Sequence, residues 1–84
     1  MITAGIDVGT GGIKVLILKG DQVLSRVKVL SDLEESKAIQ VALEEAISRA
    51  GIEKGAIEYM TATGAGGKNV AGADDVITDI TSAV

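Results

Sequence analysis

The 84-residue sequence contains no cysteine, no histidine and no proline, and its single aromatic residue is Tyr59. Without cysteine or histidine, these residues form no disulfide, supply no thiolate and bind no metal through imidazole. The apolar residues are almost all Ile, Val, Leu and Ala. A domain of this length buries only about 60% of the surface that its unfolded chain exposes, so we expect a small aliphatic core.

Excess positive charge and long apolar runs are also missing. The formal net charge is -4 and the pI is about 4.6. Nucleic-acid binding depends on clustered lysine and arginine, so this balance argues against a nucleic-acid partner. No stretch reaches the ~18 consecutive apolar residues of a membrane span, and no basic segment precedes a cleavable apolar one. We therefore expect a cytoplasmic protein with no membrane partner.

Three strands are predicted in the first 30 residues. Residues 2–8 (ITAGIDV) and 13–19 (IKVLILK) are mostly apolar, and Gly20-Asp21 is a two-residue turn signal. Residues 22–30 (QVLSRVKVL) alternate a mostly apolar face with a largely polar one, as an outer strand does. These three segments are predicted to form an antiparallel meander.

A helix is predicted to follow the meander. Ser31-Asp32-Leu33-Glu34 has the spacing of a capping box, and Gly51 provides a C-terminal stop. Between them, apolar residues recur at the three- and four-residue intervals of one helix face. They are Ile39, Ala42, Leu43, Ala46, Ile47 and Ala50.

The remaining residues predict one more strand and one more helix. Residues 56–63 (AIEYMTAT) should lie parallel to the first strand, because a helix connects the two. After a glycine-rich loop, residues 73–84 return to helical spacing, with Asp74 and Asp75 at their start. The order β-β-β-α-β-α predicts an α/β fold, with a three-strand antiparallel meander plus one parallel strand. Such a sheet requires a further strand, so we expect a domain truncated at its C-terminus.

Two nucleotide-binding motifs are excluded by their spacing. A G-x-G-x-x-G fingerprint from Gly9 requires glycine where Lys14 stands, and a helix where a strand is predicted. A P-loop ending at Gly67-Lys68 requires glycine where Ala62 stands, and Ser or Thr where Asn69 stands.

The remaining candidate site is the hairpin Asp7-Val8-Gly9-Thr10-Gly11-Gly12-Ile13-Lys14. Its glycines let backbone N–H groups approach a phosphate, Thr10 adds a hydroxyl, and Lys14 supplies a point charge. Asp7, predicted to end a buried strand, needs a partner such as a hydrated Mg²⁺ carried by a nucleotide. The alternative is a plain glycine hairpin in which Asp7 caps its own turn. The local pattern leaves both open.

The stretch GIDVGTGGIKVLIL resembles the first phosphate motif of the actin, sugar kinase and heat-shock chaperone superfamily. The resemblance implies a partial ribonuclease H-like, actin-like ATPase fold over residues 1–84. Together with ATGAGG and ADDVITDITSAV, the stretch more narrowly resembles the ATPase subunits of benzoyl-CoA reductases, the D-type above all. It also resembles the related activators of 2-hydroxyacyl-CoA dehydratases.

This narrower resemblance implies a parent protein that binds ATP and couples its hydrolysis to electron transfer. Its partners would be a homologous ATPase subunit, which shares a [4Fe-4S] cluster, and acyl-CoA-reducing subunits. By position, Asp7 would hold Mg²⁺ through water, and Lys14 would lie near the ATP phosphates. The residues around these phosphates would be Gly9, Thr10, Gly11 and Gly12. Gly11 departs from the Ser or Thr common in activators. Catalytic residues and cluster cysteines would lie beyond residue 84.

Two alternative functions stay open. One is a sugar or small-molecule kinase of the same superfamily, and the other is a non-catalytic excised subdomain. Residues 1–84 by themselves would hold only half of a nucleotide cleft, so we expect this piece alone to be inactive. We favour a flexible strand-to-helix connector for the loop 64–67 over a part of the nucleotide cleft, because the loop carries no catalytic side chain.

Overall fold

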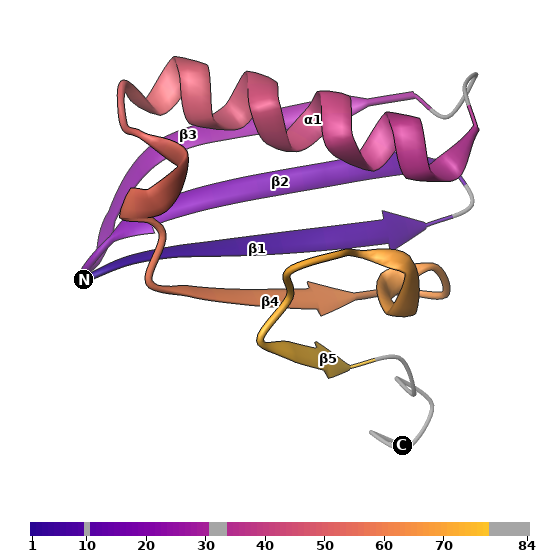
Figure 1. The fold of residues 1–84 in the computed structure, drawn as a ribbon. Coiled ribbons are helices and arrows are strands. Elements are labelled where there is room, and N and C mark those ends of the chain that lie inside the picture. The colour runs from indigo at the N-terminus through magenta and orange to yellow at the C-terminus, as the bar shows by residue number, and fades with distance from the viewer. Residues whose placement is uncertain (10, 31–33, 78–84) are drawn as a thin grey trace.

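The computed structural model describes residues 1–9, 11–30 and 34–77 (Figure 1). In chain order, the elements are β1 (Ile2–Gly9), β2 (Gly12–Lys19), β3 (Gln22–Val29), α1 (Glu35–Ala50), the 3-10 helix η1 (Lys54–Ala56), β4 (Tyr59–Thr63), the 3-10 helix η2 (Gly67–Asn69) and β5 (Asp75–Ile77). The five strands form one sheet in the order β3-β2-β1-β4-β5. Figure 1 shows α1 lying across one face of this sheet.

The antiparallel meander predicted from the sequence is confirmed. β1 pairs with β2 and β2 with β3, both antiparallel, and each strand matches its predicted range to within one residue at either end. β4 pairs parallel with β1, as expected for a strand reached through a helix. The central strand β1 is therefore hydrogen-bonded on both sides.

The core lies between the sheet and α1 and is aliphatic. Its largest fully buried side chains are Ile6, Val8, Ile13, Val15 and Ile17, which are alternate residues of β1 and β2. Burying each such side chain contributes roughly 1.5–3 kcal/mol. Because side chains in a strand alternate between faces, the residues between them point to the opposite face, which α1 does not cover.

Helix α1 packs on β2 and β3 through the predicted apolar stripe, except that Ala50 is only partly buried and Ala38 is buried in addition. Its buried residues are Ala38, Ile39, Ala42, Leu43, Ala46 and Ile47. The three alanines are 0% exposed and let the helix backbone approach the sheet closely. The one buried polar residue of the sheet, Ser25, donates its hydroxyl to the carbonyl oxygen of Ala46 at 2.7 Å.

The helix ends as predicted at Gly51, which adopts the left-handed conformation with φ of 71°. Its N–H donates to the carbonyl of Ser48, and the N–H of Ile52 donates to that of Ile47. These two bonds form a Schellman motif, which satisfies the last helix carbonyls. At the other end, Glu34 makes no side-chain capping bond, and residues 31–33 of the predicted capping box lie outside the described residues.

The last two predicted elements differ from the structure. The strand predicted over residues 56–63 begins only at Tyr59, because η1 precedes it. The helix predicted over residues 73–84 is wrong over Asp75–Ile77, which form β5 parallel to β4. Asp74 explains this difference. Its N–H donates to the carbonyl of Met60 and its carboxylate accepts from the N–H of Met60, both at 2.7 Å.

These two bonds align the following residues with the edge of β4, and the β-branched pair Val76-Ile77 suits a strand. Residues 78–84 of the predicted helix lie outside the described residues. Among the helices of the described ranges, none combines the length and apolar character needed to cross a membrane.

We predict that Ala42→Leu lowers the free energy of unfolding by about 1–3 kcal/mol, because the larger side chain has no room between α1 and the sheet. Val41→Leu is the matched control on the outer face of the same helix, where Val41 is 46% exposed. Its effect should stay within about 0.5 kcal/mol. Chemical denaturation measures both, and equal losses would contradict this packing arrangement.

Candidate functional site

A row of polar side chains crosses the uncovered face of the sheet near the carboxyl end of β1. The strand register places Asp7 opposite Lys14 on one side and Thr63 on the other. Lys14 in turn lies opposite Lys28 of β3. Since Ile6 and Val8 are buried in the core on the α1 side of the sheet, the residue between them must point to the opposite face. The row is Lys28, Lys14, Asp7 and Thr63.

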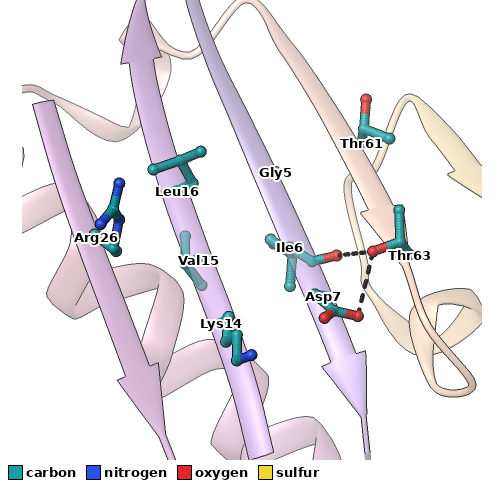
Figure 2. Close-up of a pocket in the computed structure, with 9 residues that line it drawn as sticks. All are labelled: Gly5, Ile6, Asp7, Lys14, Val15, Leu16, Arg26, Thr61 and Thr63. Carbon is teal, nitrogen blue, oxygen red and sulfur yellow. Dashed lines mark hydrogen bonds between the residues drawn. The ribbon is translucent and has the colours of Figure 1, made fainter. Parts of the chain in front are cut away.

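Asp7 itself is exposed, whereas the sequence suggested a carboxylate at a buried strand end. The hydroxyl of Thr63 lies 3.3 Å from Oδ1 of Asp7 and 3.5 Å from the carbonyl oxygen of Ile6, and donates to these acceptors (Figure 2). Within the described ranges, Asp7 forms no ion pair. Its hydrogen-bond partner there comes from β4 and not from its own turn, which leaves the carboxylate charge available to a cation.

The hairpin between β1 and β2 closes on the pair Gly9 and Gly12. Gly12 has φ of 151°, and a Cβ there would lie 2.8 Å from the carbonyl oxygen of Val29. Both the backbone conformation and the contact with β3 therefore require glycine. Thr10 lies outside the described residues.

The hairpin glycines and three residues of the polar row line an open pocket of about 290 Å³. Its lining residues are Asp7, Gly9, Gly11, Gly12, Lys14 and Lys28. The structure thus brings together every predicted site residue that it describes. Lys28 was missed by sequence reasoning. The sequence did indicate that Lys28 lies on the polar face of the third strand. It did not indicate that Lys28 lies opposite Lys14 of the second strand.

A second hollow, of about 340 Å³, adjoins the row on the same face. Figure 2 shows Gly5 at its centre, between Leu16 of β2 and Thr61 of β4, and Arg26 of β3 lies opposite Leu16. A Cβ on Gly5 would meet no atom within 4 Å, so the missing side chain leaves the middle of the sheet face open.

The loop after β4 packs against the end of β1, and is more than the connector suggested by the sequence. The N–H of Gly66 donates to the carbonyl of Val8 at 3.1 Å. Gly64 has φ of 88°, and a Cβ there would overlap that carbonyl and lie 2.7 Å from Oδ1 of Asp7. The side-chain amide of Asn69 donates to Glu35 at 2.6 Å, which ties the loop to the start of α1. The repeated glycine after a strand was the available sequence signal.

The donor set fits some cofactors and not others. The described residues contain no group of three acidic, histidine or cysteine side chains that could cage a metal ion. A single exposed carboxylate, Asp7, suits Mg²⁺ that keeps its waters and is also bound by phosphate. An iron–sulfur cluster does not fit residues 1–84, because its usual ligands are cysteines and the sequence has none.

No protein-family model matches the sequence. The chain is 38% identical over 80 residues to the activator of lactoyl-CoA dehydratase from Anaerotignum propionicum. That alignment covers 95% of this chain and 31% of the relative, so the chain spans about a third of the relative's length.

Two solved structures of similar proteins match over 93% of this chain. One is the activator of the 2-hydroxyisocaproyl-CoA dehydratase from Clostridium difficile with bound ADPNP, with 28% identity, a TM-score of 0.83 and 29% of that chain covered. The other is component A of the (R)-2-hydroxyglutaryl-CoA dehydratase from Acidaminococcus fermentans, with 29% identity, a TM-score of 0.84 and 30% covered.

A ROK hexokinase from Thermus thermophilus matches less completely, with 27% identity, a TM-score of 0.63, and coverage of 75% of this chain and 22% of that one. Together these matches confirm the predicted fold class, a mixed α/β sheet that forms part of an actin-like ATPase fold. The chain resembles activators of 2-hydroxyacyl-CoA dehydratases in both sequence and structure.

The contact between Gly64 and β1 gives a test of the site's architecture. We predict that Gly72→Ala lowers the free energy of unfolding by about 1–3 kcal/mol, because alanine is strained at the Gly72 φ of 86°. A Cβ at Gly72 would meet no other atom within 4 Å, so the backbone strain is the whole cost. Gly64→Ala has nearly the same φ and must also displace Val8 and Asp7, so its loss should exceed that of Gly72→Ala by about 1–3 kcal/mol. Denaturant titration measures both. Equal losses would mean that the loop is not held against β1.

Proposed function

We propose that this chain is the N-terminal part of an ATP-dependent activator of a 2-hydroxyacyl-CoA dehydratase, and that its β1–β2 hairpin binds the phosphates of ATP. One observation carries the proposal. Asp7, three glycines and Lys14 converge on one pocket, in a chain similar over 93% of its length to an activator with bound ADPNP. Residues 1–84 would then be one part of an actin-like ATPase domain.

The hairpin has the groups that phosphate binding requires. Backbone N–H groups at Gly9, Gly11 and Gly12 can approach phosphate oxygens, because these residues have no side chain to intervene. Lys14 adds a positive charge from the neighbouring strand. Phosphoryl transfer depends mostly on positioning and electrostatic stabilisation, and a hairpin of this kind supplies both for the ground-state nucleotide.

Asp7 is proposed to hold the Mg²⁺ of the nucleotide through water. The Thr63 hydroxyl, 3.3 Å from Oδ1, orients the carboxylate from the other side. A bound Mg²⁺ would neutralise charge on the phosphates. Thr63 is thus a positioning residue, which acts through Asp7.

The parent protein is proposed to couple ATP hydrolysis to electron transfer, together with a homologous ATPase subunit and an acyl-CoA-reducing partner. A reducing partner would be a benzoyl-CoA reductase, and for an activator the partner would instead be a 2-hydroxyacyl-CoA dehydratase, which eliminates water. These are the two classes whose ATPases the sequence resembles. The relatives found by sequence and structure are activators of the dehydratase class, which favours it. Any [4Fe-4S] cluster would take its cysteines from outside these 84 residues.

A sugar kinase of the same superfamily is the second candidate, and the match to a ROK hexokinase supports it. That match covers 75% of this chain with a TM-score of 0.63, against 93% and 0.83 for the ADPNP-bound activator. The activator is therefore favoured. A kinase would also need a general base and a pocket for a hydroxyl substrate, both supplied by other residues.

We predict that Asp7→Asn in the full-length protein lowers ATPase turnover roughly 10- to 100-fold, the usual loss when a group that positions a metal is removed. Stability should change by no more than about 0.5 kcal/mol, because the side chain is exposed. Steady-state phosphate release measures the turnover.

Asp21→Asn is the control for this experiment. It removes the same charge from an exposed turn between β2 and β3, at the edge of the sheet away from the hairpin. Its turnover should equal that of the unmodified protein. An unchanged rate for Asp7→Asn would refute the role assigned to Asp7.

A further inference from the structure

Lys28 shares the hairpin pocket but belongs to no role described so far. It lies on β3, directly opposite Lys14 of β2, and both side chains are exposed on the face that α1 leaves uncovered. Both line the pocket of about 290 Å³ at the glycine hairpin. Two lysines from adjacent strands therefore border the same space.

This arrangement is unfavourable in the absence of an anion. Like charges directly opposite each other on neighbouring strands destabilise a sheet. Within the described ranges neither lysine forms an ion pair. The nearest carboxylate in the row, that of Asp7, lies two strands from Lys28, which is about 10 Å at the usual strand spacing. Asp7 offsets at most one of the two positive charges.

The hairpin and the end of β3 are also held together by packing. Gly12 leaves so little space that a Cβ would lie 2.8 Å from the carbonyl oxygen of Val29, the residue after Lys28. This contact therefore holds the backbone of β3 beside Lys28 close to the hairpin backbone. An anion bound by the hairpin N–H groups would lie in the pocket that Lys28 also lines.

We propose that Lys28 is a second phosphate-binding cation of this site. The inference rests on the proposed function, and it adds a preference for the length of the phosphate chain that the site binds. With two lysines and one aspartate in the row, the pocket has a surplus positive charge, which favours a polyphosphate chain over a single phosphate. The ligand class is therefore a nucleoside di- or triphosphate, and a nucleoside monophosphate is discriminated against.

The test is isothermal titration calorimetry on the full-length protein with ADPNP, ADP and AMP in the presence of Mg²⁺. Lys28→Ala should weaken ADPNP binding about tenfold or more, as expected for the loss of a charge-assisted contact. It should change AMP binding much less. Lys28→Arg keeps the charge and should restore most of the affinity. Thermal stability of Lys28→Ala should be unchanged or raised, because a like-charge contact is removed.

Lys19→Ala is the matched control, since it removes the same charge from an exposed lysine at the far end of β2. It should leave ADPNP binding unchanged. If Lys14→Ala weakens ADPNP binding while Lys28→Ala does not, the role of Lys28 is refuted and the proposed function stands. Equal losses for ADPNP and AMP would also refute it. If the unmodified protein fails to bind ADPNP, the proposed function itself fails.

Discussion

The two-residue alternation of β1 determines where each group of the candidate site lies. Ile6 and Val8 are buried in the core on the α1 side of the sheet, so Asp7 between them has to face the uncovered side. A shift of one residue in register would bury the carboxylate and expose both apolar side chains. Because β1 is paired with β2 and β4 at once, this register is fixed from both sides. Core packing on one face thereby positions charge on the other.

Close backbone contacts then hold the rest of the site against this strand. The loop after β4 reaches the end of β1 at Gly64 and Gly66, and the hairpin reaches β3 at Gly12. At all three positions a side chain would overlap a neighbouring atom. Glycine therefore serves two purposes here. It allows these elements to meet, and in the proposed function it also lets backbone N–H groups of the hairpin approach the phosphates.

The meander, the helix stripe and the stop at Gly51 could be predicted from the sequence, because each depends on local periodicity or a local turn residue. The last element could not. The sequence around Asp74 is typical of the start of a helix, but in the structure its N–H and its carboxylate form hydrogen bonds with the backbone of Met60 in β4. The role of Lys28 was missed for a related reason. Strand alternation indicates which face a side chain occupies, and only the pairing register shows that it lies opposite Lys14.

The division of groups across the described sheet suggests what this part of the fold contributes. The polar row and the hairpin offer charges and N–H groups, which suit phosphates and their metal. The sequence has no histidine or cysteine that could add imidazole or thiolate chemistry to this row. An activator and a hexokinase share this part of the fold. The phosphate-binding role proposed for this shared part is compatible with both, since function depends on the site and not on the fold. In the proposed function, the choice between electron transfer and sugar phosphorylation thus falls to residues that face the nucleotide from the other half of its cleft.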